Sequence, residues 1–335
     1  MSALIPVIDL ALFASSSAAD RATVVKDVQK ALEEVGFLMI SGHGVPEDLI
    51  GRVTASNLAF FDLPDAEKRR YTSARPGGRG YSAMRGRTVG IAQDPTLLKS
   101  LQESYGVGPV DVPADEAWYR TEGAGHSYEP NLWPDEPHDF APSVQQYYRE
   151  MDRLYRMIMR LFAIALGLPE TWFDDKINRH GSVLRLTHYP ALDAEPLPGE
   201  QRAGAHTDVG AMTILHIDET RDSLQVKLRS GEWVFVNKTP GAFIINIGDM
   251  MMRWTNDKWL SNTHRVVNPP FVNGRSARRL SLVYFCQTNY DTIVECLPNC
   301  SGPGNPARYP PLSSGEYSAM RSAMRYGYDL PKKAG

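Results

Sequence analysis

Three side chains in the second half of the sequence could bind one metal ion together. His206 and Asp208 stand two residues apart, and 55 residues lie between Asp208 and His264. On an extended segment, residues two apart project from the same face. Two imidazoles and one carboxylate leave up to three coordination positions open, as in the facial triad of Fe(II) oxygenases. His-x-Asp pairs also occur by chance, so the spacing alone leaves iron, zinc and no metal open.

A second pair of side chains could bind an anion. Arg279 and Ser281 are also two residues apart, at the start of the apolar run 280–285. On a strand they point the same way, and a guanidinium fork beside a hydroxyl suits a carboxylate. Arg279 and not Arg278 is the expected clamp, because only Arg279 precedes Ser281 by two. The alternative is a surface arginine pair beside a strand, which poorly explains why a basic residue begins this run.

The elements that position these residues are expected to be strands. After residue 182 the sequence consists of short apolar or alternating segments separated by turn residues, which is typical of β-structure. The expected strands span residues 183–189, 213–217, 223–228, 233–236, 243–247 and 279–286. Such a series indicates a closed or double-sheet β architecture, of which the jelly roll is one form. The first half predicts helices at 18–34, 47–61 and 142–166, and a mobile glycine-rich loop at 71–90. The last of these helices is the longest, and an apolar stripe on it is expected to be buried, formed by Val144, Tyr148, Met151, Tyr155, Ile158, Phe162 and Ala165.

Composition narrows the class of partner. The 335 residues include 36 Lys and Arg against 39 Asp and Glu, a formal net charge of −3, which offers no basic patch for nucleic acid or an anionic membrane. We find no signal peptide, and no run of 18 apolar residues that could span a membrane. Three cysteines cannot all pair, which favours free thiols in a reducing compartment. The sequence therefore predicts a cytoplasmic protein, a monomer or weak homo-oligomer, that acts on a small molecule.

Longer segments resemble a known family. Gly204-Ala-His-Thr-Asp-Val-Gly-Ala-Met-Thr-Ile-Leu215 resembles the first metal motif of the isopenicillin N synthase-like oxygenases. Asn246-Ile-Gly-Asp249, followed by Arg253-Trp-Thr-Asn256 and Ser261-Asn-Thr-His-Arg-Val266, is similar to the second motif, and Arg279-Leu-Ser281 to the Arg-x-Ser signature. The resemblance extends in order over nearly the whole chain, and its other segments are Ile5-Pro-Val-Ile-Asp9, Val35-Gly-Phe37, Gly42-His-Gly-Val45, Phe60-Phe-Asp-Leu-Pro64 and Tyr309-Pro-Pro311.

The resemblance implies a fold and its organisation. The expected fold is mainly β with flanking helices (α+β), with a distorted double-stranded β-helix, or jelly roll, as its core. Residues 1–120 would form a helical N-terminal region, and residues 121–181 a connector with the long helix. Residues 182–290 would form the jelly-roll core, and residues 291–335 a C-terminal segment that covers the active site.

The resemblance also implies cofactors. His206, Asp208 and His264 would hold Fe(II), and the co-substrates would be 2-oxoglutarate and O₂. Arg279 and Ser281 would bind the distal carboxylate of 2-oxoglutarate, and the Tyr189 hydroxyl would add a hydrogen bond. Thr187 stands where many relatives have Asn, which leaves its contact with the co-substrate open.

The implied activity is oxidation of a small molecule by hydroxylation, desaturation or cyclisation, with release of succinate and CO₂, in specialised metabolism. An anionic substrate, such as an amino acid or another carboxylate, would explain several arginines near the pocket. The candidate substrate contacts are Tyr81, Arg85 and Arg87 in the glycine-rich loop, and Arg185 and Phe285 on strands that face the cavity. A solvated loop is the alternative for the first three.

Three other functions compete with this one. An oxidative cyclase of the isopenicillin N synthase type would use the same iron ligands without 2-oxoglutarate. A zinc hydrolase could use the triad, but the sequence lacks a His-Glu-x-x-His helix and leaves Arg279 and Ser281 unexplained. A catalytically inactive small-molecule-binding protein would keep the fold alone.

Overall fold

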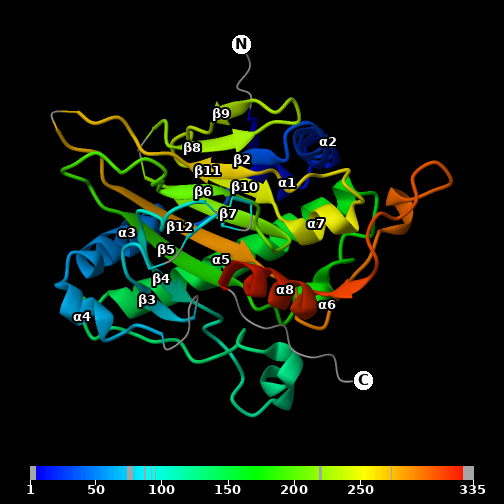
Figure 1. Ribbon diagram of the computed structural model, residues 1–335. Helices are drawn as coiled ribbons and strands as arrows, with labels where there is room; N and C mark the ends of the chain where they lie inside the picture. The colour runs from blue at the N-terminus through cyan, green and yellow to red at the C-terminus, as the bar shows by residue number, and fades with distance from the viewer. Residues whose placement is uncertain are drawn as a thin grey trace.

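The computed structural model describes residues 5–73, 78–86, 88–91, 93–94, 96–218, 221–272 and 274–326, with the side chains of 325 and 326 left out. These residues form two facing β-sheets with helices along the outer face of the larger one (Figure 1). The core is a distorted jelly roll, as the sequence predicted.

The strands build one large and one small sheet. The large sheet has the order β1-β2-β10-β7-β12-β5-β4-β3, and the small one β6-β11-β8-β9. The strands of the large sheet are β1 (Val7–Asp9), β2 (Phe37–Ser41), β3 (Gly80–Ser82), β4 (Glu103–Val107), β5 (Val183–Tyr189), β7 (Met212–Ile217), β10 (Phe243–Ile247) and β12 (Arg279–Cys286). Those of the small sheet are β6 (Ala203–His206), β8 (Leu224–Lys227), β9 (Trp233–Phe235) and β11 (His264–Val266), and β13 (Ile293–Val294) pairs with β14 (Leu312–Ser313).

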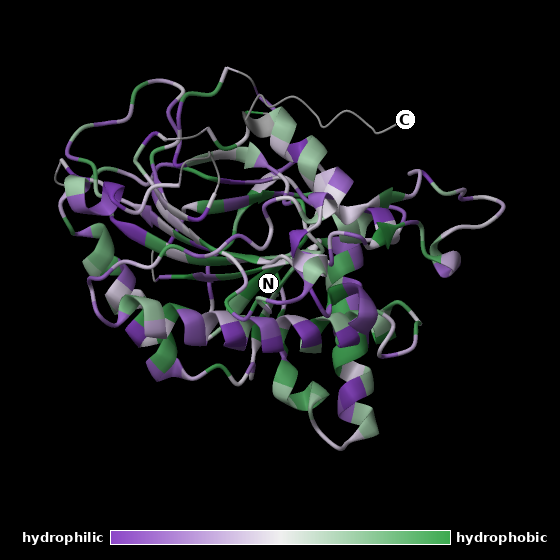
Figure 2. Ribbon diagram, turned by 90° about the horizontal axis from the view of Figure 1, so that it is seen from below, coloured by the Kyte–Doolittle hydropathy of each residue, from purple (hydrophilic) through white to green (hydrophobic). Residues whose placement is uncertain are grey.

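Two apolar clusters hold these layers together. One lies between the sheets and includes Val226 from the small sheet and Ile217 and Ile244 from the large sheet. The other lies between the large sheet and the helices, where α5 packs against α2 and α3. The helices are α1 (Leu10–Phe13), α2 (Ala18–Glu34), α3 (Glu47–Phe61), α4 (Asp65–Arg69), α5 (Phe140–Ala165), α6 (Asp174–Ile177), α7 (Asp249–Trp254) and α8 (Ser314–Tyr326). The apolar stripe predicted for the long helix is buried, and Figure 2 shows its hydrophobic and hydrophilic residues alternating along the ribbon.

The glycine-rich loop expected at 71–90 is partly ordered β-structure. β3 pairs with β4, which pairs in turn with β5, so both extend the large sheet. Sequence patterns missed these strands because β3 is only three residues long and its pairing is with distant segments.

A buried ionic network lies on this added part of the sheet. Glu103 accepts hydrogen bonds from Lys68 (2.9 Å), from the Tyr81 hydroxyl (2.5 Å) and from His188 (2.7 Å). Burial raises the pKa of Glu103, but these donors outweigh burial and hold the pKa below its ordinary value. The carboxylate is therefore ionised at neutral pH and ties three segments of the chain together.

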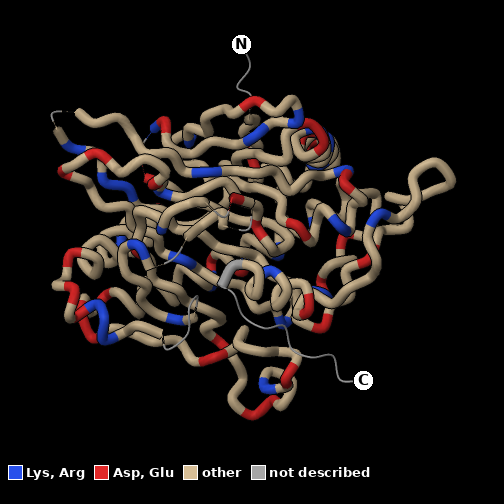
Figure 3. Tube along the Cα trace, viewed as in Figure 1, with Lys and Arg blue, Asp and Glu red and all other residues tan. Residues whose placement is uncertain are grey.

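Charges of both signs are interspersed along the chain (Figure 3). Among the described residues, no helix is both long enough and apolar enough to cross a membrane. Cys286, Cys296 and Cys300 are free thiols, as the sequence predicted.

Candidate active site

Strand pairing brings the three predicted metal ligands together. β11 runs antiparallel to β6, and His264 is the direct partner of His206 in the register. Asp208 lies in the turn that follows β6. One ligand atom from each of the three side chains lies within 4.8 Å of the others. The third ligand, which is distant in sequence, therefore joins the first two through a single β-ladder.

The two imidazoles are oriented for coordination. Nδ1 of His206 lies 2.8 Å from the carbonyl oxygen of Gly204, and Nδ1 of His264 lies 3.1 Å from that of Asn262. A carbonyl oxygen can only accept, so each Nδ1 carries a proton, and the neutral form of each ring has its lone pair on Nε2. These Nε2 atoms lie 3.8 Å and 3.7 Å from the carboxylate oxygens of Asp208. A neutral imidazole in this tautomer presents its Nε2 lone pair, which is what a divalent cation requires.

Asp208 is held as an anion by its surroundings. Its Oδ2 accepts hydrogen bonds from Thr213 Oγ1 at 2.6 Å and Asn246 Nδ2 at 2.9 Å. Burial raises the pKa of Asp208, but the positive charges that His264 and His206 carry when protonated and these two hydrogen bonds outweigh burial, so the pKa lies below its ordinary value. Two nitrogens and one carboxylate oxygen on one side of a buried space fit Fe(II) with open positions.

Thr213 and Asn246 were not predicted as site residues. Asn246 could have been found, because it is the one polar residue in the apolar segment Phe243-Ile-Ile-Asn-Ile247. A buried amide in such a strand needs a hydrogen-bond partner. Thr213 carried no comparable signal, since threonine is common in strands.

A cavity of about 1220 Å³ extends from this triad. Arg279, Ser281 and Tyr189 line it, with Arg279 paired directly with Tyr189 across β12 and β5. Arg279 is buried and donates from one Nη to Ser223 Oγ at 2.7 Å, while its Nε and the Oγ of Ser281 have no hydrogen-bond partner among the described residues. Buried donors without partners are costly, and a carboxylate would satisfy both. These residues therefore fit one end of 2-oxoglutarate.

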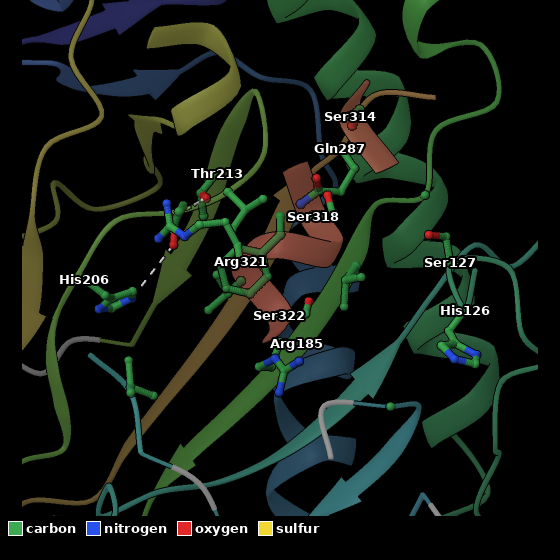
Figure 4. A pocket seen from close by; sticks show the side chains of 18 of the residues that line it. His126, Ser127, Arg185, His206, Thr213, Gln287, Ser314, Ser318, Arg321 and Ser322 are labelled. Atoms are coloured by element: carbon green, nitrogen blue, oxygen red, sulfur yellow. Dashed lines mark hydrogen bonds and ion pairs between the residues drawn. The ribbon is translucent and has the colours of Figure 1, made fainter. Parts of the chain in front are cut away.

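The cavity includes some of the other predicted residues. Arg185, Phe285 and Thr187 line it, and so does Ser322 of α8, which Figure 4 labels together with Arg185. Arg185 is buried on the same face of β5 as Thr187 and Tyr189.

The predicted loop residues lie elsewhere. Tyr81 is buried in the core beside Glu103, and Arg85 forms an ion pair with Glu200 at 2.8 Å. Neither residue lines the cavity. Tyr81 belongs to β3, and its side chain points into the helix-covered side of the sheet, whereas Arg85 is paired with Glu200. Arg87 lies outside the described residues.

Two family models match the chain. Residues 5–136 match the N-terminal region of the non-haem dioxygenases of morphine synthesis, and residues 180–288 match the 2OG-Fe(II) oxygenase superfamily.

Curated relatives cover almost the whole chain. A 2-oxoglutarate-Fe(II) type oxidoreductase, hxnY, of Emericella nidulans is 32% identical over 96% of this chain and 90% of its own length. A homoarginine-6-hydroxylase of Glycine max is 35% identical over 82% of this chain and 80% of its own length. Among solved structures, a full-length Neurospora crassa protein in complex with alpha-KG and thymine superposes with a TM-score of 0.83 at 29% identity, over 96% of this chain and 97% of the other.

Proposed function

The chain belongs to the 2OG-Fe(II) oxygenase superfamily, and from this premise we propose that His206, Asp208 and His264 hold its iron. The enzyme is a non-haem dioxygenase that uses Fe(II), 2-oxoglutarate and O₂ to oxidise a small molecule. The observation that carries the proposal is the meeting of three ligand atoms within 4.8 Å. The relatives named for 2-oxoglutarate do not favour a cyclase that works without it, a zinc hydrolase or an inactive binding protein.

Arg279, Ser281 and Tyr189 are proposed to bind 2-oxoglutarate at its distal carboxylate. The iron, when bound with 2-oxoglutarate and O₂, supplies the oxidising power, and succinate and CO₂ are released. Arg279 supplies a buried positive charge, and Ser281 donates from its hydroxyl. These contacts orient the co-substrate along the cavity, which leaves room beside the metal triad for the substrate.

The neighbouring arginine provides a matched control for this assignment. Arg278 pairs with Asp62 at 2.8 Å and donates to His188, so it faces away from the cavity. Arg279→Met should raise the Kd for 2-oxoglutarate about tenfold to a hundredfold, because a charged hydrogen-bonded partner is lost. Arg278→Met should leave it within about twofold. Binding is measured anaerobically on the Fe(II) protein by the absorption band that 2-oxoglutarate gives.

The metal triad is tested on the same protein. His206→Ala or Asp208→Ala should abolish succinate release and the absorption band, while the folded structure persists by circular dichroism. Full succinate release by either variant would reject the iron assignment. Unchanged 2-oxoglutarate binding by Arg279→Met would reject the co-substrate assignment and leave the triad intact.

For the substrate, we propose a small molecule with an anionic group, such as an amino acid or another carboxylate, that Arg185 binds. Arg185 is buried on the cavity wall, two residues from Thr187 and four from Tyr189 on β5. A homoarginine-6-hydroxylase among the relatives is named for an amino acid. The same cavity is lined by Glu122, Glu129 and Glu316, which are suited to a positive group elsewhere on the substrate.

Screening of amino acids, other carboxylates and neutral pyrimidines for stimulated succinate release tests this substrate class. With the best acid found, Arg185→Gln should raise the KM for that acid about tenfold and leave the Kd for 2-oxoglutarate unchanged. Turnover of a neutral pyrimidine such as thymine, with no acid accepted, would contradict the proposal.

We also propose that α8 covers the active site. Its Arg321 forms an ion pair with Asp249 at the start of α7 and donates to Thr207 Oγ1 at 3.2 Å. Asp249 in turn donates its backbone N–H to the carbonyl of Asp208 at 2.8 Å. The C-terminal helix is thus tied to the turn that carries the proposed carboxylate ligand, and closure of the cavity would be coupled to the geometry of that turn.

A further inference from the structure

A second buried arginine lies beside the proposed clamp for 2-oxoglutarate. Arg202 immediately precedes β6, and 1% of its surface is exposed. The guanidinium carbon of Arg202 lies 5.5 Å from the centre of the Tyr189 ring, and that of Arg279 lies 5.4 Å from the same centre. Both distances are within the range of a cation–π contact. Tyr189 therefore contacts two guanidinium groups, of which only Arg279 lines the cavity.

The charges around Tyr189 are out of balance among the described residues. Burial and the positive charge of Arg279 lower the pKa of Arg202 to about 10, so Arg202 remains a cation at neutral pH. Asp218 is the one described carboxylate that acts on both guanidinium groups, and it also accepts a hydrogen bond from the Leu280 N–H at 2.6 Å. Two buried cations beside one carboxylate favour the arrival of another anion.

The hydrogen-bond donors point to the same conclusion. One Nη of Arg202 donates to the carbonyl of Ala277, while the other is buried without a hydrogen-bond partner in the described part of the chain. Arg279 Nε and Ser281 Oγ are also buried, and no described residue hydrogen-bonds to either atom. Unsatisfied buried donors are uncommon in folded proteins, and a cluster of them favours the binding of an anion.

We propose that Arg202 is a positioning residue for 2-oxoglutarate, acting from behind Tyr189 to strengthen the positive site that receives the distal carboxylate. Arg202 does not line the cavity, so it acts through Tyr189 and Arg279 by charge and by holding the ring. The proposal rests on the assignment of Arg279 and Ser281 to that carboxylate. It predicts that Arg202 affects only ligands that carry a second carboxylate.

Two keto acids separate this role from a structural one. 2-Oxobutanoate has the same 1-carboxylate and 2-keto group as 2-oxoglutarate but lacks the distal carboxylate. Binding of each acid is measured on the anaerobic Fe(II) protein by its absorption band, for the wild type and for Arg202→Met, Arg202→Lys, Arg279→Met and Arg278→Met. No turnover is needed for this measurement.

Arg202→Met should raise the Kd for 2-oxoglutarate about tenfold, and Arg202→Lys, which keeps the charge, should raise it less. The Kd for 2-oxobutanoate should stay within about twofold of wild type in both variants, which also verifies that they are folded. The inference would be overturned if Arg202→Met weakened the binding of both acids equally, or if it left 2-oxoglutarate binding unchanged. If Arg279→Met also left 2-oxoglutarate binding unchanged, the proposed clamp itself would fail, whereas an effect of Arg279→Met alone would refute only the role of Arg202.

Discussion

Removal of the Thr213 hydroxyl tests whether hydrogen bonding to Asp208 controls iron affinity. Thr213 of β7 is the direct partner of Asn246 of β10, so the register places both donors at one oxygen of the carboxylate. Both side chains and Asp208 are buried. Thr213→Val preserves the branched shape that suits a strand and removes only the donor at 2.6 Å.

The expected loss follows from the strength of that hydrogen bond. A hydrogen bond to a charged group contributes about 1.5–3 kcal/mol. Asn246 still donates to the same oxygen at 2.9 Å, so the Asp208 carboxylate remains partly oriented in the variant. We therefore expect Thr213→Val to lose ~1.5–2 kcal/mol of Fe(II)-binding free energy, near the lower end of this range. This loss would raise the Kd for Fe(II) about 10-fold to 30-fold. Substitutions around metal ligands typically cost about 10-fold to 100-fold in affinity.

Anaerobic titration with Fe(II) at saturating 2-oxoglutarate measures this Kd through the absorption band of the complex. Thr213→Ser is the matched control, because it keeps the hydroxyl and loses a methyl group, and it should bind Fe(II) within about twofold of wild type. Wild-type affinity in Thr213→Val would refute the reasoning. Equal weakening by Thr213→Ser and Thr213→Val would attribute the effect to packing and also refute it.

Three further predictions concern the surroundings of the site. Glu103→Gln should lower the free energy of unfolding by about 3 kcal/mol because it breaks a buried ion pair. The difference in unfolding free energy from wild type should be full above pH 4.5, the ordinary glutamate pKa, and should shrink as the pH falls through the lowered folded-state pKa. Urea unfolding at several pH values measures this difference. Gly248→Ala should destabilise the fold by about 1–3 kcal/mol and weaken Fe(II) binding, because the Cβ of the alanine would lie 2.1 Å from the carbonyl oxygen of Gly210. An unchanged melting temperature and an unchanged Fe(II) affinity would contradict this prediction. Arg321→Gln should release α8 by removing its ion pair with Asp249, seen as hydrogen exchange in α8 at least about tenfold faster, and equal exchange in variant and wild type would rule out this anchor.

Local sequence patterns were enough to predict which residues share a face on each strand. Alternation along an extended chain sets which side chains project together, so Arg279-x-Ser281 could be predicted as a pair on one strand. The same local rule grouped His206 with Asp208. The buried stripe of the long helix was predicted because the 3.6-residue period is also a local property of the chain.

Pairing between distant segments was decided only by the tertiary structure. The register of β11 against β6 places His264 opposite His206, and that of β10 against β7 brings Asn246 to Thr213. Long-range pairing also explains why Tyr81 lies in the core and not in the expected loop, because β3 joins the large sheet through β4. Arg202 lies outside the strands, and its guanidinium group contacts the Tyr189 ring only in the folded chain. Such contacts depend on which segments lie side by side in the folded chain, and the periodicity of a single segment carries no information about its partners.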